Sequence, residues 1–261
     1  MATTAGTLAS STALVGFGLD SVIEVSSAAA VAWQFTATDH ERRERTALRV
    51  IAVSFFALAG NESTLAAARR LGEPVAALVF ASARNPGGGF RTGARAQEED
   101  IARASALYAC LTTVPTFYER HRADRDLRCS NRVIYAPGVP VFRDDTGRFL
   151  HHPYHVTMLT AAAPNLHALT GQQPKLVATV PSALRARAHR ILAVAAAHGH
   201  RRLVLGAWCC GVFGNDPTTV AAAFTAALHE CNHFDHIVFA VLDRAPATPT
   251  YRTFADQRKA T

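Results

Sequence analysis

An uninterrupted apolar run at residues 75–83 leads into a loop with three consecutive glycines, Gly87, Gly88 and Gly89. The run has neither a helical face nor an alternation of polar and apolar residues, so it is typical of a strand buried on both sides. Such strands occur in sheets that are covered by helices on both faces. Because ligands of open α/β folds bind beyond the carboxyl ends of the strands, the glycine loop marks a candidate site.

The pattern around this strand alternates between helices and strands. Helices are expected at residues 62–71 with Asn61 as the N-cap, at 97–112, and at 183–198 after Ser182 as the cap. A further helix begins at Pro217, since proline is favoured at the first helical position. Strands are expected at residues 132–135, 155–161, 202–207 and 236–242. The predicted fold class is therefore α/β, a three-layer α/β/α sandwich with a mixed, mostly parallel sheet.

Composition and charge narrow the classes of function. The chain has 261 residues, of which 49% are hydrophobic, and is long enough for one sizeable core. The 27 basic and 20 acidic residues give a formal net charge of +7, which suits an anionic substrate. No basic run with interleaved aromatic residues is present, so we expect no direct nucleic-acid binding. The five cysteines form no C-x-x-C pair and are expected to be reduced thiols of a cytoplasmic protein.

The first 58 residues differ from the rest. Between residues 2 and 35 the only charges are Asp20 and Glu24, and this stretch is long enough to cross a bilayer. Residues 16–25 resemble the second transmembrane helix of cation-efflux transporters, which carries metal-binding acids at this spacing. The other helices of such a transporter are absent. We therefore interpret residues 1–58 as hydrophobic, transmembrane-like helices that could tether the chain to a membrane, and residues 59–261 as a separate catalytic domain.

Seven residues separate the glycine loop from Gln97, Glu98 and Glu99, which occupy the first turn of an expected helix. The helix dipole favours acidic residues there, which explains one carboxylate better than a consecutive pair. Adjacent helical residues point roughly 100° apart, so the two carboxylates cannot have the same surroundings. One can hold a substrate hydroxyl while the other handles a proton, beside a loop whose bare amides suit a phosphate.

A second glycine loop follows the strand expected at residues 202–207. It contains Gly211, Val212, Phe213, Gly214 and Asn215, and it leads into the helix that begins at residue 217. A helix N-terminus is a ready site for an anion. Phe213 is a candidate platform for a ribose or a base. Two glycine loops at two strand ends indicate a ligand that is held on both sides of a diphosphate.

Four segments together resemble the microbial-type poly(ADP-ribose) glycohydrolases, which are macrodomain proteins. These are residues 61–71 (NESTLAAARRL), the G-G-G-x7-Q-E-E signature, residues 133–145 (VIYAPGVPVFRDD) and residues 211–217 (GVFGNDP). The resemblance covers about residues 60–245. It implies hydrolysis of the ribose–ribose O-glycosidic bonds of poly(ADP-ribose), with release of ADP-ribose.

The resemblance also implies roles for the residues of the two loops. Glu99 would be the general acid that protonates the leaving oxygen and then the base that activates water, while Glu98 would position the ribose hydroxyls. The substrate-binding residues would be Gly87, Gly88, Gly89, Phe90, Gln97, Gly211, Val212, Phe213, Gly214 and Asn215. No cofactor and no metal are implied. The partner would be an ADP-ribose polymer or an ADP-ribosylated protein, and the chain is expected to be a monomer.

Two positions depart from the family pattern. Cys209 stands where a glycine is expected after Trp208, and Val79 stands where many members carry asparagine. A catalytically weak ADP-ribose-binding module is therefore one alternative, and a hydrolase of single ADP-ribose units is another. A fragment of a membrane cation transporter is a remote third alternative.

Two histidine-containing stretches are weighed as metal sites and set aside. Residues 229–233 spell H-E-x-x-H, but they fall at the end of an expected helix and have no recognisable third ligand. Residues 151–155 include three histidines after a predicted turn and are expected to form an exposed loop.

Overall fold

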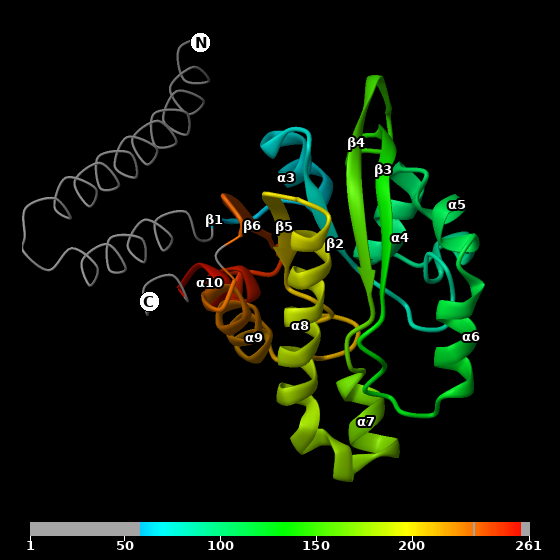
Figure 1. Ribbon diagram of the computed structural model, residues 1–261, viewed down its shortest axis with the longest axis vertical. Helices are drawn as coiled ribbons and strands as arrows, with labels where there is room; N and C mark the ends of the chain where they lie inside the picture. The colour runs from blue at the N-terminus through cyan, green and yellow to red at the C-terminus, as the bar shows by residue number, and fades with distance from the viewer. Residues whose placement is uncertain (1–57, 232, 257–261) are drawn as a thin grey trace, which may run out of the picture. The chain divides into compact units, whose positions relative to one another are not determined.

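The computed structural model describes residues 58–231 and 233–256, all within the unit Ala57–Thr261. They form a six-stranded sheet with the strand order β1-β6-β5-β2-β4-β3 (Figure 1). The strands are β1 (Leu58–Gly60), β2 (Ala76–Phe80), β3 (Val133–Arg143), β4 (Phe149–Ala161), β5 (Arg202–Gly206) and β6 (His236–Ala240). Neighbouring strands are parallel except β3 and β4, which are antiparallel. The predicted mixed, mostly parallel sheet is confirmed.

Helices cover both faces of the sheet (Figure 1). One face carries α3 (Thr64–Leu71), α4 (Gln97–Ala104), α5 (Leu107–Thr112) and α6 (Pro115–Ala123). Leu65, Leu107 and Tyr118 from these helices share a buried core with Val79 of β2 and Met158 of β4. This core fixes the helix that bears the acidic pair against the central strands.

The opposite face carries α8 (Val180–Ala197), α9 (Pro217–His229) and α10 (Pro249–Asp256). Phe239 of β6 lies between Phe224 of α9 and Phe254 of α10, with ring centroids 6.0 and 5.4 Å away. A short helix α7 (Leu166–Gln172) and the 3-10 turns η1 (Phe90–Thr92) and η2 (Pro174–Thr179) lie in the connections. The predicted three-layer α/β/α arrangement is therefore confirmed.

The helix expected at residues 62–71 begins two residues later than predicted and has a different cap. Ser63 is the N-cap, because its hydroxyl accepts a hydrogen bond from the Ala66 amide at 3.0 Å. Asn61 was the predicted cap, but its side chain binds the backbone of Asp243. Its Nδ2 donates to the Asp243 carbonyl at 3.1 Å, and its Oδ1 accepts from the Asp243 amide at 2.9 Å. Asn61 therefore joins β1 to the chain that follows β6.

The helix expected at residues 97–112 is two helices. Ser105 has an extended backbone, with φ −143° and ψ 174°, and bridges to Val141 of β3. Its hydroxyl donates to the carbonyl of Ile101 at 2.7 Å and accepts from the amide of Leu107 at 3.2 Å. One side chain therefore ends α4 and starts α5.

Ser182 is also not the cap that the sequence predicts. Helix α8 already begins at Val180, with a proline in its first turn. The Ser182 hydroxyl donates to the carbonyl of Thr179 at 2.8 Å, so it accepts no amide in the manner of an N-cap.

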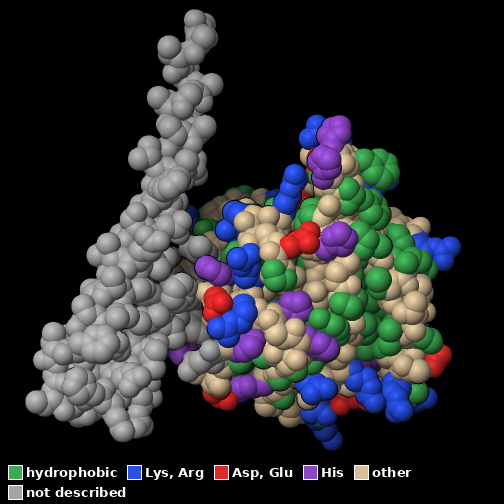
Figure 2. Space-filling model, turned by 45° about the horizontal axis from the view of Figure 1, so that its top comes forward, with side chains coloured by type: hydrophobic (Ala, Val, Ile, Leu, Met, Phe, Trp, Pro, Cys, Tyr) green, Lys and Arg blue, Asp and Glu red, His purple; other side chains and the backbone are tan. Residues whose placement is uncertain are grey.

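Strands β3 and β4 are much longer than the sequence predicts. They form a hairpin whose turn is closed by the backbone of Asp144. The Asp144 amide donates to the Arg148 carbonyl, and the Asp144 carbonyl accepts from the Gly147 amide, both at 2.9 Å. The histidines at 151, 152 and 155 are exposed as expected but lie in β4, not in a loop. Figure 2 shows histidine and basic side chains at the projecting end of this hairpin. Beyond the sheet body neither face is buried, so the strand lacks the apolar pattern that would reveal it.

Residues 1–57 of the expected N-terminal helices lie outside the described residues, as do Asp20 and Glu24. Leu58, the last residue of that segment, begins strand β1 and is not helical as predicted. Among the residues that the structure describes, no helix is both long and apolar enough to span a membrane. The interpretation of residues 1–57 stays a prediction.

Candidate active site

The candidate site lies at the carboxyl ends of β2, β4 and β5, which are neighbours in the sheet. All three strands run in the same direction, so the chain leaves them at one edge. The glycine loop leaves β2 there, and the second glycine loop leaves β5. The sheet order therefore brings together two loops that are more than 100 residues apart in the sequence, as we expected.

Gln97 fixes the start of α4 to the end of β2. Its Oε1 accepts a hydrogen bond from the Phe80 amide at 2.9 Å. Its Nε2 donates to the Leu78 carbonyl at 2.7 Å and to the Thr64 hydroxyl at 3.0 Å. Both ends of the amide are thus bound by the protein. The predicted contact of Gln97 with substrate remains a prediction, and the observed contacts give it a positioning role.

Glu98 is a buried carboxyl, only 2% exposed. Its Oε2 accepts a hydrogen bond from the Ser82 amide at 2.5 Å, whereas its Oε1 has no partner among the described residues. Burial raises the pKa of Glu98 to about 8, and the neighbouring charge of Glu99 adds to the rise, against the backbone amides of Ser82 and Gly87. The raised pKa favours the neutral form of the Glu98 carboxyl, and its Oε1 is buried without a hydrogen bond from any described residue.

Glu99 is half-buried and turns back onto the glycine loop. Its Oε1 accepts a hydrogen bond from the Gly89 amide at 3.0 Å, while no described residue donates to its Oε2. A Cβ at Gly88 would collide with the Glu99 carboxylate. Gly88 also has φ +59°, which disfavours any side chain. The loop therefore needs glycine at this position for Glu99 to lie where it does.

The amides of the glycine loop differ from the open phosphate cradle that the sequence suggests. The Gly88 amide donates to the Asn85 carbonyl at 3.0 Å, and the Phe90 amide donates to the Gly87 carbonyl at 3.3 Å. The Gly89 amide holds Glu99. This loop thus uses its amides to hold the Glu99 carboxylate and its own turn. Contact of Gly87 to Gly89 with substrate remains a prediction.

Phe90 covers the glycine loop from one side. Its ring centroid is 4.7 Å from that of Tyr108, and a Cβ at Gly87 would lie 3.0 Å from the Phe90 ring. The ring is only partly buried, and the predicted contact of Phe90 with substrate remains a prediction.

The second glycine loop is anchored at both ends. Trp208 is 1% exposed, and its Nε1 donates to the Ala161 carbonyl at the end of β4 at 3.1 Å. The Asn215 side chain donates through Nδ2 to the Pro164 carbonyl at 3.0 Å. Its Oδ1 is buried without a partner among the described residues. A Cβ at Gly214 would collide with the His167 ring, so glycine allows the loop to pack against α7.

Between these anchors lies a run of backbone amides that no described residue binds. No described residue accepts a hydrogen bond from the amides of Gly211, Val212 and Phe213. Gly211 and Val212 are exposed, and 71% of Val212 is accessible to solvent. Successive unpaired amides suit an anion. The second loop is therefore better suited to bind an anion than the first, and its predicted contact with a diphosphate remains a prediction.

Cys209 adopts a backbone conformation that favours glycine, with φ +57°. Burial raises the pKa of its thiol, and the charges of Cys210 and Glu98 add to the rise. The position where the family pattern has glycine is also one where the backbone favours it.

Arg187 is a buried residue of the site region that the sequence does not reveal. Its guanidinium is 1% exposed and donates to the carbonyls of Ala162, Arg128 and Cys129 at 2.6 to 2.9 Å. Burial lowers its pKa to about 10. Arg187 ties the chain after β4 to the segment before β3, and an arginine in an alanine-rich helix carries no signal of that role.

The stretches weighed as metal sites do not converge on a site. His229 ends α9, and Glu230 lies 3.5 Å from His189. Within residues 58–231 and 233–256, no three side chains of His, Cys, Asp or Glu are grouped to hold a metal ion. The five cysteines are free thiols, as expected.

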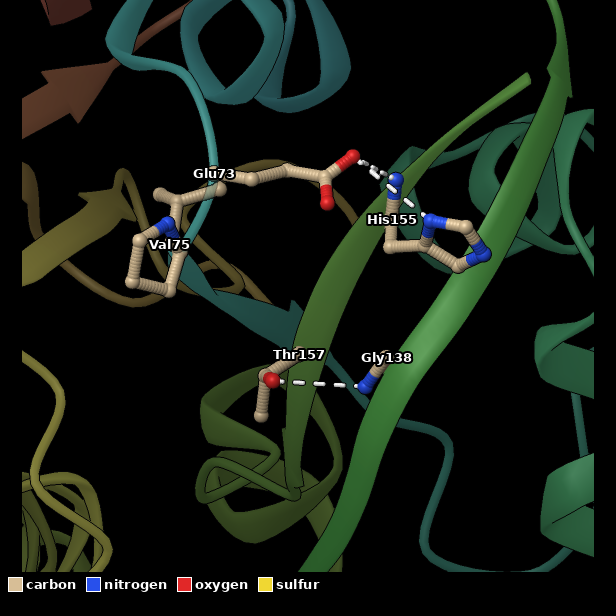
Figure 3. A pocket seen from close by; sticks show the side chains of 6 residues that line it. Glu73, Val75, Gly138, His155 and Thr157 are labelled. Atoms are coloured by element: carbon tan, nitrogen blue, oxygen red, sulfur yellow. Dashed lines mark hydrogen bonds and ion pairs between the residues drawn. The ribbon is translucent and has the colours of Figure 1, made fainter.

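A hollow of about 310 Å³ opens beside the amino end of β2, where the middle of the β3–β4 hairpin passes it (Figure 3). The Glu73 carboxylate accepts from the His155 amide at 2.6 Å, and the Gly138 amide donates to the Thr157 hydroxyl at 3.3 Å. The polar groups that line it are thus paired with one another. The hollow is separate from the acidic pair.

The described residues thus form a three-layer α/β/α domain in which two adjacent carboxyls lie beside one glycine loop, with a second glycine loop at the neighbouring strand end. The family profile described as "Microbial-type PARG, catalytic domain" matches residues 19–144, where PARG is poly(ADP-ribose) glycohydrolase. This chain belongs to the microbial-type PARG family. The match begins inside residues 1–58, which we interpreted as a transporter-like segment.

Solved structures of PARG agree with the chain over most of its length. PARG from Thermomonospora curvata bound to the inhibitor ADP-HPD is 50% identical, covers 80% of this chain and 82% of that chain, and has a TM-score of 0.74. PARG from Deinococcus radiodurans in complex with ADP-ribose is 44% identical, covers 83% of this chain and 90% of that chain, and has a TM-score of 0.76. No curated protein sequence matches the chain.

Proposed function

We propose that the chain hydrolyses the ribose–ribose O-glycosidic bonds of poly(ADP-ribose) and releases ADP-ribose. The observation that carries this proposal is the unequal surroundings of two adjacent carboxyls: Glu98 is buried with one unpartnered oxygen, and Glu99 is half-buried and held by the Gly89 amide. Unequal carboxyls are what a glycosidic bond requires, since one must transfer a proton while the other holds the sugar. Membership of the PARG family supports the choice of substrate.

Glu99 carries the proton in this proposal. The Gly89 amide fixes its Oε1, and its Oε2 stays available to the substrate. The carboxylic acid gives its proton to the leaving ribose oxygen as the glycosidic bond breaks and an oxocarbenium-like centre forms. The resulting carboxylate then takes a proton from the attacking water, which restores the acid.

Glu98 binds the sugar. Its Oε2 is taken by the Ser82 amide, so the unpartnered Oε1 is the atom that contacts a ribose hydroxyl. With a pKa raised to about 8, the neutral carboxyl can donate to a hydroxyl as well as accept from one. Pairing this atom with the substrate removes the cost of leaving it unsatisfied.

The second glycine loop holds the diphosphate. The amides of Gly211, Val212 and Phe213 donate to its oxygens, and Phe213 covers the adjoining ribose. The buried Oδ1 of Asn215 accepts from a ligand hydroxyl or amine. The loop thus neutralises charge with backbone dipoles, in the way that nests of amides bind anions.

One observation favours a second candidate function, a catalytically weak ADP-ribose-binding module. Cys209 places a side chain in a left-handed backbone conformation of the second glycine loop, at a position where the family pattern has glycine. If that thiol narrows the space for the scissile ribose, ADP-ribose still binds but the bond is not cleaved.

The test uses the full chain and three variants: Glu99→Gln, Glu98→Gln and, as a matched control, Glu119→Gln at an exposed position of α6. With poly(ADP-ribose) as substrate, we expect the wild type and the control to release ADP-ribose and Glu99→Gln to release none. Equal release by wild type and Glu99→Gln overturns the catalytic assignment. Calorimetric binding of ADP-ribose without cleavage by the wild type selects the binding module.

The same preparation tests whether the chain is tethered to a membrane and whether it is a monomer. We propose that the chain acts as a cytoplasmic monomer on ADP-ribose polymers or ADP-ribosylated proteins, with membrane contact only through residues 1–58. Extraction of the full chain without detergent, followed by light scattering at the monomer mass, is the expected outcome for an untethered monomer.

A further inference from the structure

Three exposed arginines lie on two segments that meet beside the first glycine loop. Arg84 is in the turn that follows β2, and Arg122 and Arg125 are at the end of α6 and just after it. The Arg122 guanidinium donates through Nη1 to the Arg84 carbonyl at 2.7 Å, so the end of α6 is fastened to the start of the first glycine loop. We call Arg84, Arg122 and Arg125 the arginine rim.

Hydrogen bonds also connect this rim to the second glycine loop. The Gln173 side chain, at the end of α7, donates to the Arg125 carbonyl at 2.8 Å and accepts from the Leu127 amide at 3.1 Å. The His167 amide in α7 donates to the Phe213 carbonyl at 3.1 Å. Figure 1 shows α7 and the C-terminal end of α6 at the same end of the sheet. The arginine rim therefore joins the first glycine loop to the helix that holds the second.

Arg84 is close to the acidic pair. Its amide donates to the Ser82 hydroxyl at 3.3 Å in a tight turn, and the Ser82 amide donates to Oε2 of Glu98. Because consecutive Cα atoms are about 3.8 Å apart, the Cα atoms of Ser82 and Arg84 are separated by less than about 8 Å. Arg84 is therefore within reach of a ligand that extends beyond the acidic pair.

The positive charge of the rim is not neutralised by the protein. None of its three arginines forms an ion pair with a described residue. Of the two acidic residues between positions 122 and 128, Asp126 is paired with Arg128 at 2.6 Å, which leaves Asp124. Surfaces that carry charge of one sign attract ligands of the opposite sign. The arginine rim is therefore suited to an anion.

The two glycine loops offer different groups to a substrate with more than one diphosphate. The second loop has three amides that no described residue binds, whereas the first loop uses its amides for its own turn and for Glu99. A polymer that is cut between two ADP-ribose units has a further diphosphate on the unit that leaves. Beside the first loop, guanidinium groups can bind it, since their planar fork fits phosphate oxygens.

Resting on the proposed function, we propose that the arginine rim binds the diphosphate of the leaving ADP-ribose unit. Two consecutive units are then held together, the terminal one by the second glycine loop and its neighbour by Arg84, Arg122 and Arg125. A polymer is thereby bound more tightly than a single ADP-ribose unit. The rim touches no reacting atom and contributes binding, not proton transfer.

The test compares the affinities of two ligands, ADP-ribose and a dimer of two linked ADP-ribose units, by calorimetry. The full chain carries Glu99→Gln so that the dimer is not cleaved during the titration. Arg84→Gln or Arg125→Gln is added to this background, because neither guanidinium binds a described residue and the fold loses no hydrogen bond. Arg190→Gln, at an exposed position of α8 on the opposite face, is the matched control for the loss of one positive charge.

We expect the background chain to bind the dimer about 100-fold more tightly than ADP-ribose. Arg84→Gln and Arg125→Gln should each weaken dimer binding by about tenfold, since a charged hydrogen bond to phosphate is lost, and should leave ADP-ribose binding unchanged. Arg84→Lys should lie between, because it keeps the charge and loses the fork. Arg190→Gln should change neither affinity. Added salt should reduce the preference for the dimer.

Equal affinities of the background chain for the two ligands overturn the proposal, and so does a dimer affinity that neither rim variant lowers. An equal loss of affinity for both ligands assigns the arginines to the terminal unit and overturns it too. The titrations need no turnover. A selective loss of dimer binding, in a chain whose wild type releases no ADP-ribose, therefore supports the arginine rim while the proposed hydrolase function fails.

Discussion

Gly88 is the residue at which the site tolerates least change. A Cβ there meets the Glu99 carboxylate, and the backbone has φ +59°. We expect Gly88→Ala to lower ADP-ribose release by about 100-fold, since Glu99 must move to make room. The left-handed conformation should cost about 1–2 kcal/mol of unfolding free energy. Release assays and denaturant unfolding measure the two effects.

Gly171 provides the matched control for that substitution. It lies in α7, and a Cβ there would meet no atom within 4 Å. Gly171→Ala should leave release unchanged and raise the unfolding free energy by about 0.5–1 kcal/mol, as expected for alanine in a helix. Full activity of Gly88→Ala would show that Glu99 does not need its observed place.

Cys209 is the residue whose replacement by glycine we expect to increase both stability and ADP-ribose affinity. Its φ of +57° costs roughly 1–2 kcal/mol for a residue with a side chain. Cys209→Gly should relieve this cost, offset in part by the greater freedom of glycine in the unfolded chain. ADP-ribose affinity, measured by calorimetry, should rise several-fold because the loop that we propose for the diphosphate then carries no side chain at this position.

The variant Cys209→Ala separates the two causes. It removes the thiol and keeps the side chain in the left-handed conformation. If the thiol limits binding, Cys209→Ala gains affinity without gaining stability. Weaker binding by both variants would contradict a restricting role for Cys209.

At the residue scale, spacing alone predicts that Glu98 and Glu99 lie together beside Gly88, because the three positions belong to one strand–loop–helix unit. The partners of Gln97 could not be predicted, since the amide of Phe80 and the carbonyl of Leu78 become its neighbours only when α4 docks on β2.

At the scale of elements, the contact between α4 and β2 decides where both carboxyls lie. Gln97→Ala would remove three hydrogen bonds and leave the Leu78 carbonyl and Phe80 amide unpaired. We expect a loss of about 1–3 kcal/mol of unfolding free energy for each of these two groups that is left without a hydrogen bond. ADP-ribose release should fall as well, because the first turn of α4 is no longer fixed.

Gln172→Ala is the comparison, since Gln172 is exposed at the end of α7. Thermal unfolding and release assays of both variants give the answer. Wild-type stability in Gln97→Ala would mean that the apolar contacts of α4 suffice to place the acidic pair.

The elements that the sequence predicts well are those with buried apolar faces, such as β2, β5, β6 and the helix after Asp216. The break at Ser105 was missed because its cause is a bridge to Val141, a partner 36 residues away. The outer half of the β3–β4 hairpin was missed because it packs on no second layer. The local pattern of apolar residues indicates which elements are buried. It does not indicate elements that are held only by tertiary contacts or by hairpin pairing.

At the scale of the whole molecule, the buried strand at residues 75–83 was enough to predict helices on both faces. The edge strand β1 was not predicted, since it has three residues, Leu58–Gly60, and pairs only with β6. Parallel neighbours also place the two glycine loops at one edge. That placement is a property of the sheet order and belongs to no single motif.

The buried Glu98 makes the stability of the whole molecule depend on pH. Its pKa is raised from 4.5 to about 8 in the folded chain, so between these values the folded state binds more protons than the unfolded state. The unfolding free energy therefore falls as pH rises through this window, by up to about 5 kcal/mol. Burial lowers the pKa of His121 and His200. These two histidines therefore lower the unfolding free energy as pH falls, which is the opposite dependence.

Glu98→Gln isolates the contribution of the carboxyl, because the histidines are common to both chains. We expect the variant to gain stability relative to the wild type as pH rises from about 4.5 to about 8, and the difference to be constant above that range. Glu119→Gln, at an exposed carboxyl, should follow the wild type throughout. Denaturant unfolding at a series of pH values measures the three curves. Parallel curves for Glu98→Gln and the wild type would mean that Glu98 ionises in the folded chain as it does in the unfolded chain, and its burial would then have no part in binding the ribose.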